Sequence, residues 1–590
     1  MKPSKKNIPA PKKPIAPVRK PRETNVHKSS GLPSLYTLLE NHFSKHKNSY
    51  LYVCLITAVV FALICFDAKI SLANDDALYI EAGSNYAKNF FGYFYVANAP
   101  LYPMTLGILI KIFGVKLIVL KFFSIVFFAS GILMLFKAFE NRVPYLILIP
   151  ALLLTVINFP FLMYASLTYS ECLFLLVQGL SFFILFKLFD RHIKENNDSV
   201  TIKETILGAV IIGGISVLML LTRNVASGFI GIILVFLLFY RKFLLAGLSL
   251  VSFGLIYAAY RFLLATVWKL DNSQFTSQKG IMFQKDAYNP QMGQETTWGF
   301  IERFWGNCQI YISSRLYYVL GFREEMSPNN IPLTLASIFL ILAAVWYMYK
   351  NKHIHLLFTT LFFSGLLAFS FFSLQTSWGQ TRFIMVYLPL ILMAVLYLIH
   401  ELTLEISLAQ IIFPFVFLML FFTGIAATLK EAKERFPVFM ENINGDPTFG
   451  YTPDWQNYIK MTKWCAQNLP NETKQVAVRK APMSFIFSEG KEFYPIYNTP
   501  TENPDSLLIP LRKSNVNYIM TAELRLDPSR YLEGQFIGTM HRYIYYIAQK
   551  YPEAFLPVHQ EGETERSVLY KIKWDYIDSI KNNKPMTGGI

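Results

Sequence analysis

Charged residues and cysteines are scarce in this sequence. Only 16% of its 590 residues are Asp, Glu, Lys or Arg, whereas a soluble domain carries about a quarter. The five cysteines form no CxxC pair, and three lie within apolar runs: Cys54, Cys65 and Cys172. A disulfide framework and a zinc site are therefore not expected. The sequence also shows no internal repeat, and its composition excludes a collagen-like or wholly disordered chain.

Long apolar runs take the place of the missing charge. The sequence is 53% hydrophobic with 52 Phe, and several runs reach the roughly 20 residues that span a bilayer. These features exclude a purely soluble enzyme and predict a mainly α-helical, polytopic membrane protein. The net charge of +16 suggests basic cytoplasmic loops and contact with anionic membrane lipids. Because no folded basic module is visible, we expect no nucleic-acid partner.

Eleven apolar runs are predicted to span the membrane, and a twelfth is not. The eleven are Tyr50–Phe66, Ile118–Phe136, Pro144–Phe161, Cys172–Phe189, Ile206–Leu221, Gly228–Phe239, Leu244–Val267, Ile331–Tyr349, Leu356–Leu374, Phe383–Ile399 and Ile406–Ala427. The run Leu101–Phe113 is short and contains Pro103 and Lys111. We therefore expect a juxtamembrane or re-entrant helix there.

The positions of the basic segments predict the orientation. The Lys/Pro-rich tail, residues 1–48, is expected to be disordered and cytoplasmic. With eleven spans, it shares its side of the membrane with four basic segments: 137–142, 187–203, 241–242 and 350–355. Counting the short run as a span would place these segments outside, against the positive-inside rule. We therefore predict a multi-pass protein of the cell inner (plasma) membrane.

Three parts of the chain are expected on the outer face. Two are the loops 67–117 and 269–330, which belong to a transmembrane domain over residues 49–428. The third is an extracytoplasmic α/β domain over residues 429–590. Within it, an amphipathic helix is predicted at Trp455–Asn468, and short strands at Gln475–Val478, Asn517–Met520 and Ser567–Ile572.

Two adjacent carboxylates follow the first span closely. Asp75 and Asp76 stand in the stretch Asn-Asp-Asp-Ala-Leu-Tyr that ends at Tyr79. If this stretch is helical, the two side chains point about 100° apart and cannot share one task. One can face a site while the other caps the start of the helix, where anions are favoured. An Asp pair after a span can also be no more than a solvated capping pair.

The surroundings of this pair resemble the GT-C superfamily of membrane glycosyltransferases. Asp-Asp-x-x-Tyr is followed by Gly92 and by Pro-Leu-Tyr-Pro at 100–103, which opens a short apolar helix. The likeness is to the branch containing protein O-mannosyltransferases and lipid A aminoarabinose transferases. Family members show Asp-Glu-x-x-Tyr and Pro-Pro-Leu-Tyr-Pro; here Asp76 replaces the Glu and Ala99 the first Pro.

Three later motifs extend the resemblance over roughly residues 61–427, in order. Ser-Glu-x-Leu-Phe contains Glu171 at the outer start of a span. Arg223 follows a later span, and Arg382 stands in a Thr-Arg-Phe motif where the family has Arg-Tyr, ahead of Pro389. All of these positions are expected on the outer face.

The resemblance implies a fold, a reaction and a set of site residues. The reaction is inverting transfer of a sugar from a polyprenyl-phosphate donor to an acceptor: lipid A, a protein hydroxyl, another glycan or a teichoic-type polymer. The implied residues are Asp75 and Asp76 for catalysis, Arg223 and Arg382 for the donor phosphate, and Tyr79, Glu171 and Tyr102 for substrate. Lys279 and Lys285, basic residues of the outer loop 269–330, are further candidates for binding the donor phosphate. No sugar nucleotide is required and no Asp-x-Asp metal motif is evident, so neither a cofactor nor a metal is expected.

Other interpretations of the same residues remain open. Glu171 can cap its span, and Arg223 and Arg382 can reach toward headgroups from span ends. The basic and aromatic residues of the loop 269–330 also suit an interfacial belt: Lys279, Lys285, Arg303, Arg315, Trp298, Phe304, Trp305, Tyr311, Tyr317 and Tyr318. A lipid or glycan transporter or flippase is the alternative function, although it would favour ionisable residues at mid-membrane. A non-catalytic anchor would leave the ordered motifs without a purpose.

Overall fold

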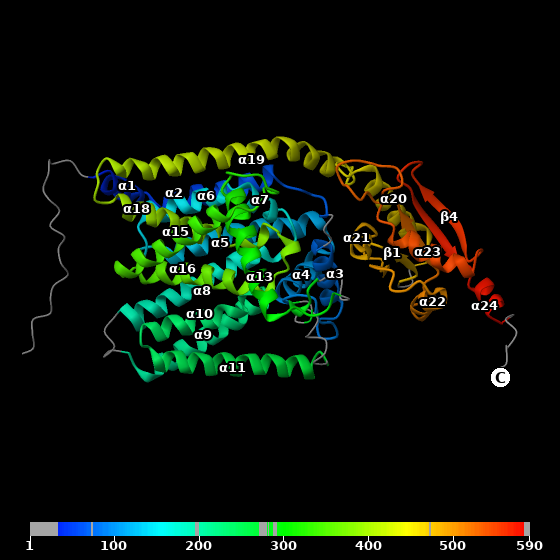
Figure 1. The fold of residues 1–590 in the computed structure, drawn as a ribbon, viewed down its shortest axis with the longest axis horizontal. Helices are drawn as coiled ribbons and strands as arrows, with labels where there is room; N and C mark the ends of the chain where they lie inside the picture. Colours follow the sequence, from blue (N-terminus) through cyan, green and yellow to red (C-terminus); the bar gives the residue numbers. More distant parts are fainter. Residues whose placement is uncertain are drawn as a thin grey trace, which may run out of the picture.

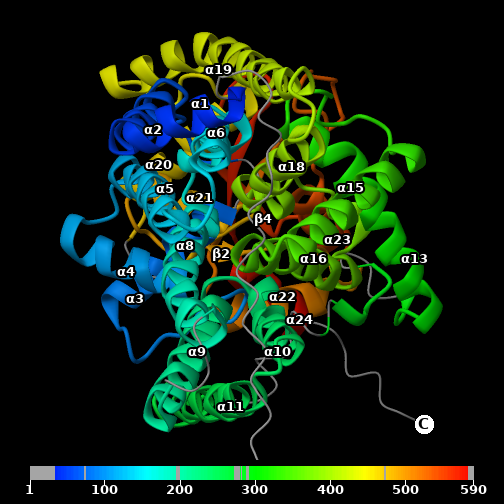
Figure 2. The ribbon, with the colours of Figure 1, turned by 90° about the vertical axis from the view of Figure 1, so that its left-hand side faces the viewer.

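The computed structural model describes residues 34–582, apart from 72–74, 195–199, 271–279, 281, 287–291 and 471–473. The molecule is elongated, with a bundle of roughly parallel helices at one end and a smaller α/β domain at the other (Figure 1). Viewed along the bundle, α19 crosses one edge, α9 and α11 form the opposite edge, and α15 and α13 lie at a third (Figure 2).

Eight helices of the described residues are long and apolar enough to cross a membrane. They are α2 (Lys47–Ile64), α5 (Leu117–Phe139), α8 (Ser170–Phe189), α9 (Ile202–Thr222), α11 (Phe243–Thr266), α15 (Ile331–Lys350), α16 (Ile354–Ser373) and α19 (Ile412–Asn444). A ninth candidate is the pair α6 (Tyr145–Val156) and α7 (Phe159–Ala165), which meet at 62°. The chain is thus a multi-pass membrane protein.

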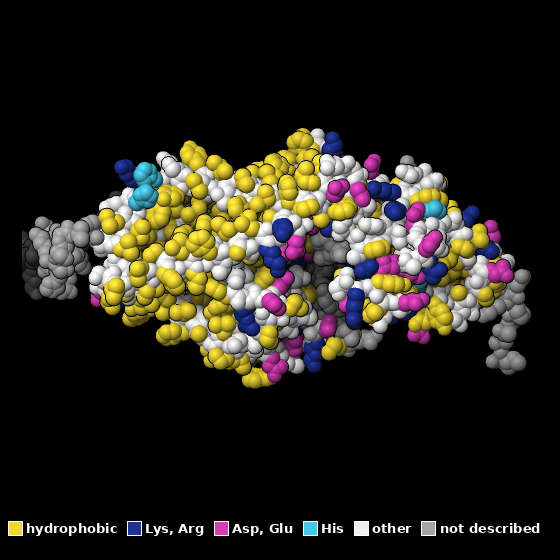
Figure 3. Space-filling view, turned by 90° about the horizontal axis from the view of Figure 1, so that it is seen from above, with side chains coloured by type: hydrophobic (Ala, Val, Ile, Leu, Met, Phe, Trp, Pro, Cys, Tyr) yellow, Lys and Arg dark blue, Asp and Glu magenta, His cyan; other side chains and the backbone are white. Residues whose placement is uncertain are grey.

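The remaining predicted spans are shorter helices. They are α10 (Phe229–Phe239), preceded by the 3-10 turn η3 (Asn224–Gly228), and α18 (Leu388–Thr403), preceded by the single turn α17 (Arg382–Met385). Each of the eleven predicted runs is therefore helical, eight at full spanning length. On the face seen in Figure 3, apolar side chains cover the bundle, whereas charged side chains gather at and beyond the junction with the α/β domain. This distribution is what a lipid-embedded bundle requires.

Helices α3 (Asp75–Lys88) and α4 (Leu101–Phe113) pack together at the end of the bundle that faces the α/β domain (Figure 1). Two glycines allow the close crossing. A Cβ on Gly83 would lie 2.8 Å from the Cβ of Leu106, and a Cβ on Gly107 would lie 2.7 Å from the Cβ of Tyr86. The short run at Leu101–Phe113 is thus a helix beside the bundle end, and it covers α3.

The N-terminal tail was predicted to be disordered up to residue 48, and this is wrong for its last part. Residues Leu35–Lys45 form α1. The Ser34 side chain accepts a hydrogen bond from the Thr37 backbone N–H. The Glu40 carboxylate accepts bonds from the backbone N–H groups of Tyr145 and Leu146, at 3.0 and 2.7 Å. These anchors order α1 because they cap two helix starts at once.

The C-terminal domain contains a five-stranded sheet in the order β2-β1-β3-β5-β4. Strands β1 (Val476–Val478), β2 (Tyr494–Pro495) and β3 (Tyr518–Ala522) are parallel, whereas β4 (Phe555–Glu561) and β5 (Ser567–Ile572) join antiparallel. Its helices are α20 (Pro453–Asn468), α21 (Ala481–Phe487), α22 (Pro504–Lys513), α23 (Thr539–Lys550) and α24 (Trp574–Asn582). The predicted helix and three predicted strands match α20, β1, β3 and β5.

Short elements fill the segment that was predicted as the second outer loop. They are α13 (Thr297–Cys308), η6 (Gln309–Arg315) and α14 (Leu316–Val319). The 3-10 turn η7 (Thr376–Trp378) precedes α17, η8 (Ala409–Ile411) precedes α19, and the π-turn η1 (Asp190–Lys194) follows α8.

Candidate functional site

Four helix ends that are far apart in sequence meet beside the α/β domain. Helix α3 begins at Asp75, α8 begins next to Glu171, α9 ends just before Arg223, and α17 begins at Arg382. The charged residues of the four motifs are therefore brought to one place.

Asp75 and Arg382 form an ion pair. A guanidinium nitrogen of Arg382 lies 2.9 Å from a carboxylate oxygen of Asp75. The Asp75 side chain keeps 37% of its surface exposed, and that of Arg382 keeps 18%. Burial would lower the pKa of Arg382, but the carboxylates of Glu171 and Asp75 outweigh burial and raise it. The guanidinium also lies 5.3 Å from the ring centre of Tyr169. The pair thus lies between a charged, partly exposed surface and the buried aromatic side chain of Tyr169.

Glu171 and Arg223 form a second, more deeply buried pair at 2.9 Å. Only 2% of the Glu171 side chain and 10% of the Arg223 side chain are exposed. One carboxylate oxygen of Glu171 has no hydrogen-bond partner in the described part of the chain. Removing one partner of such a pair is expensive, because the other charge stays buried. Since Glu171 also acts on Arg382, the two pairs form a single cluster of alternating charge.

Asp76 takes part in neither of the two ion pairs. Its side chain is fully buried and accepts hydrogen bonds from the backbone N–H groups of Ser71 (2.8 Å) and Ala77 (2.9 Å). Burial raises the pKa of Asp76 to about 6, and Lys121 and the two backbone bonds oppose that rise. Asp76 therefore holds the segment before α3 in place, while Asp75 remains accessible.

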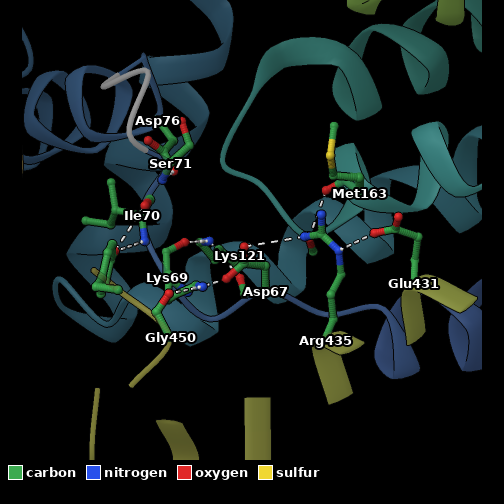
Figure 4. Close-up of polar contacts among 12 residues, drawn as sticks. Asp67, Lys69, Ile70, Ser71, Asp76, Lys121, Met163, Glu431, Arg435 and Gly450 are labelled. Carbon is green, nitrogen blue, oxygen red and sulfur yellow. Dashed lines mark hydrogen bonds and ion pairs between the residues drawn. The ribbon is translucent and has the colours of Figure 1, made fainter. Parts of the chain in front are cut away.

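The segment 67–71, which leads to Asp75, is bonded on two sides (Figure 4). On one side, the buried ammonium of Lys121 on α5 donates to the backbone carbonyls of Asp67 and Lys69. On the other side, the Lys69 ammonium donates to the Gly450 carbonyl at 3.0 Å, and the Ile70 N–H donates to the Tyr451 hydroxyl at 2.8 Å. The bundle and the C-terminal region together fix the position of α3.

A group of tyrosines lies behind the charged cluster. The ring of Tyr79 lies 5.2 Å from that of Tyr102 and 6.5 Å from that of Tyr169. Burial, helped by Glu171, raises the pKa of Tyr79 to about 12, and Arg382 and Arg223 oppose the rise. Tyr79 therefore stays a neutral hydroxyl beside the two ion pairs, and Tyr102 on α4 packs against its ring.

Lys285, one of the two lysines predicted in the loop 269–330, does not join the cluster. Lys279 lies outside the described residues. The Lys285 side chain is exposed, and its backbone N–H bonds to the Gly293 carbonyl at 3.0 Å. No contact among the described residues links its side chain to Asp75 or Arg382. Their assignment to the donor phosphate stays a prediction.

Sequence reasoning missed several neighbours of the site. Lys121 is a single basic residue inside an apolar run, so nothing in the pattern distinguished it. Arg315 was attributed to the interfacial belt, but its Nε donates to the Gly379 carbonyl at 2.5 Å, just ahead of Arg382. Lys480, in the C-terminal domain, is acted on electrostatically by Asp75. Tyr169 could have been recognised from the sequence, because it immediately precedes the Ser-Glu motif that contains Glu171. Within the described residues, no group of three or more His, Cys, Asp or Glu side chains could hold a metal ion.

Known proteins resemble this chain in structure. No protein-family profile and no curated protein sequence matches it. The oligosaccharyltransferase AglB from Archaeoglobus fulgidus, solved with an inhibitory peptide and a dolichol-phosphate, gives a TM-score of 0.51 at 13% identity. The match covers 92% of this chain and 75% of AglB. The same oligosaccharyltransferase tethered to an acceptor peptide gives 0.50 at 14% identity over 90% and 75% of the chains. ArnT from Cupriavidus metallidurans, bound to undecaprenyl phosphate, gives 0.47 at 11% identity over 89% and 98%.

At these identities the similarity concerns the fold alone. It extends over most of the chain, including the C-terminal domain, since more than nine-tenths of the sequence aligns with AglB. The resemblance that the motifs indicated is confirmed at the level of the fold: the chain has the fold of the Archaeoglobus fulgidus oligosaccharyltransferase.

Proposed function

We propose that this protein is a glycosyltransferase that moves a sugar from a polyprenyl-phosphate-linked donor to an acceptor on the outer face of the membrane. One observation carries the proposal: a half-open carboxylate, Asp75, is paired with an arginine beside a second, buried carboxylate–arginine pair. General-base catalysis needs an accessible carboxylate, and departure of a lipid phosphate needs cations nearby.

The reaction places each residue in a role. The acceptor hydroxyl oxygen bonds to the anomeric carbon, and its proton passes to Asp75. The bond from that carbon to the phosphate oxygen breaks, and the phosphate departs with the electron pair. Arg382 and Arg223 stabilise the departing anion, because a guanidinium can bond two phosphate oxygens at once. Attack opposite to departure inverts the anomeric centre.

The other predicted residues support this geometry. Glu171 holds Arg223 and acts on Arg382, so it orients both cations. Asp76 holds the segment before α3 through the backbone of Ser71. Tyr79 and Tyr102, both buried, pack against each other and would support the wall of a sugar site from behind. That the AglB structure contains a dolichol-phosphate and a peptide supports a lipid-linked donor and a separate acceptor here.

Lipid or glycan transport is the competing function, but the placement of charge favours the enzyme. The two pairs stand at the starts and ends of helices, whereas a transporter concentrates ionisable residues on broken helices at mid-membrane. Purified protein in detergent, given a labelled polyprenyl-phosphate sugar and mixed hydroxyl acceptors, should release polyprenyl phosphate. The product should have the opposite anomeric configuration, and EDTA should not stop the reaction.

The outcome separates the two functions. Movement of the labelled lipid across a proteoliposome bilayer without release of polyprenyl phosphate would replace the enzyme by a transporter. Turnover abolished by EDTA and restored by a divalent cation would contradict metal independence and leave the glycosyltransferase assignment standing.

We also propose that the C-terminal domain lies outside the cytoplasm. The basic segments of the opposite face support this orientation. All five native cysteines are buried, so Glu533→Cys, at an exposed position, creates a single accessible thiol. An impermeant maleimide should label it in intact spheroplasts. Labelling only after lysis would reverse the orientation.

A further inference from the structure

The segment that contains Arg382 has little regular structure of its own. Between the end of α16 at Ser373 and the start of α18 at Leu388, it forms the turn η7 and the four-residue helix α17. Thr381, the residue before α17, makes no side-chain hydrogen bond that caps this helix. A helix of one turn gains little stability from its own bonds. The position of Arg382 therefore depends on contacts with other parts of the chain.

The loop 269–330 supplies such contacts where the segment begins. The Asn307 side chain, on α13, donates to the backbone carbonyls of Phe371 and Leu374, at 2.9 and 2.8 Å. These carbonyls lie at the end of α16, where the helix itself leaves them unsatisfied. The Gln375 side chain donates to the Gln284 carbonyl at 2.9 Å. The first residues of the segment are thus bonded to the loop.

Two charged side chains of the same loop bond the segment closer to Arg382. The Arg315 Nε donates to the Gly379 carbonyl at 2.5 Å. Gly379 has a φ of +26°, and a Cβ there would lie 3.4 Å from another guanidinium nitrogen of Arg315. Glycine suits both this backbone conformation and this close approach. The Thr381 hydroxyl donates to the Glu325 carboxylate at 3.0 Å. These two bonds hold the residues that lead directly into α17.

A buried tyrosine of the loop packs against both ends of the segment. The ring of Tyr311 stacks on that of Phe371, with 5.4 Å between their centres, and meets that of Phe383 edge-on at 6.3 Å. Burial raises the pKa of Tyr311, whereas the charges of Arg315 and Arg382 oppose the rise. Both guanidinium groups therefore lie within electrostatic reach of one side chain, although Arg315 belongs to the loop and Arg382 to α17.

These contacts give the loop a role in donor binding. A guanidinium bonds two phosphate oxygens at once only when its plane is correctly directed, so a shift of α17 would weaken that interaction. We propose that Arg315 and Glu325 are positioning residues: through Gly379 and Thr381 they hold Arg382 in the direction that meets the donor phosphate, without touching the donor themselves. This inference rests on the proposed function, which places Arg382 at the phosphate.

The first measurement needs no donor. Hydrogen exchange over residues 374–387 is followed by mass spectrometry in the full-length protein in detergent. Arg315→Gln removes the bond to Gly379, and Thr381→Val removes the bond to Glu325 while keeping the shape of the side chain. Exchange should rise about 10-fold in Arg315→Gln and about threefold in Thr381→Val, whose bond is more exposed. Exchange at the wild-type rate in both variants would overturn the proposal.

Arg323→Gln is the matched control. This neighbouring arginine also donates to two backbone carbonyls, those of Ser313 and Pro328 at 2.9 and 2.8 Å, but both lie within the loop. The substitution should leave exchange over residues 374–387 and donor affinity unchanged. A loss equal to that of Arg315→Gln would show that the bonds to the segment have no special role, and would overturn the proposal.

The second measurement is the affinity for a fluorescent polyprenyl-phosphate sugar. Arg315→Gln should weaken it about 10-fold and Thr381→Val about threefold. Arg315→Lys should recover part of the loss, because an ammonium can still donate to the Gly379 carbonyl. In an Arg382→Ala background the effect of Arg315→Gln should shrink to less than about twofold, since residues that act through one another are not additive. Equal losses in both backgrounds would overturn the positioning role, because Arg315 would then bind the donor itself or only support the fold.

Arg382→Ala alone distinguishes this inference from the proposed function. If it leaves donor affinity unchanged, or if the wild type binds no polyprenyl-phosphate sugar, the proposed function fails. The exchange measurement still decides whether the loop holds the segment, because it is made without donor.

Discussion

Helix α8 has a carboxylate at each end, and the two ends differ in how completely their acids are paired. At the end away from the C-terminal domain, Asp190 contacts Arg142 (2.8 Å) and His355 (2.9 Å), and neighbouring Glu140 contacts Lys47 and Lys137, both at 2.9 Å. Glu140, Arg142 and Asp190 line a pocket of about 420 Å³. At the other end, Glu171 contacts one arginine, and so does half-open Asp75.

This difference in pairing indicates that acidic and basic residues serve two separate purposes at the two ends of α8. Acids that each contact two basic side chains tie helix ends together: Arg142 also donates to the Ala138 carbonyl at 3.0 Å. Acids with a single arginine and exposed surface keep capacity for a substrate. Ion pairs alone therefore do not identify a site; an accessible acid beside a buried pair does. The predictions below test this contrast.

The largest effect is expected from Asp75→Asn. The substitution keeps the shape of the side chain and removes the base, so turnover should fall about 100- to 10,000-fold, or about 3–5 kcal/mol of barrier. Release of polyprenyl phosphate measures it, with donor binding as the test of folding. Asp190→Asn, at the other end of α8, should retain near-normal turnover. Normal turnover in Asp75→Asn with loss in Asp76→Asn would show that the wrong carboxylate was chosen.

Glu171→Gln should lower the stability of the folded protein more than Asp190→Asn, its counterpart at the other end of α8, does. It leaves the Arg223 guanidinium buried without a counter-charge, a change typically worth about 3–5 kcal/mol. Asp190→Asn should cost less, because 29% of the Asp190 side chain is exposed and water can solvate what remains. Thermal unfolding midpoints in detergent compare the two variants. A larger loss in Asp190→Asn would reverse the contrast between the ends of α8.

Asp76 should make stability depend on pH. Its pKa in the folded protein, about 6, is above the ordinary value of 3.8. The protonated form is therefore favoured by folding, and its contribution is fully present below about pH 4 and lost as pH rises through 6. Two pKa units correspond to about 3 kcal/mol. The wild type should lose more stability than Asp76→Asn between pH 4 and 6 when unfolding midpoints are compared. Parallel profiles would show that Asp76 does not titrate in this range.

Arg382→Ala should weaken donor binding about 10- to 100-fold, the usual range for a charge-assisted bond. Arg382→Lys should recover only part of the loss, because an ammonium cannot bond two phosphate oxygens in one plane. Binding of a fluorescent polyprenyl-phosphate sugar measures both. Arg142→Lys, at the other end of the bundle, serves as the matched control and should bind donor normally. Unchanged affinity in Arg382→Ala would remove this residue from the phosphate site.

Local rules predicted the parts of the site that depend on helix geometry. The 100° step separates Asp75 from Asp76, and the ends of apolar runs place Arg223 and Arg382 on one face. Packing across long sequence distances could not be predicted. Lys121 lies alone in an apolar run, and its partners are backbone carbonyls that no side-chain pattern reveals. Lys480 reaches the site only because α21 packs on α3. Helix α1 was missed because its anchor is the backbone of a distant helix.

The segment 67–71 has a consequence for how this protein can be divided. Its hydrogen bonds to Lys121 on one side and to Gly450 and Tyr451 on the other belong to two regions that a sequence-based boundary at 428 would separate. A membrane part produced alone would leave the Ile70 N–H and the Lys69 ammonium without their partners, next to the start of α3. The membrane region and the C-terminal domain therefore cannot be replaced independently of each other. Chimaeras that exchange the C-terminal domain should carry the segment 67–71 with it.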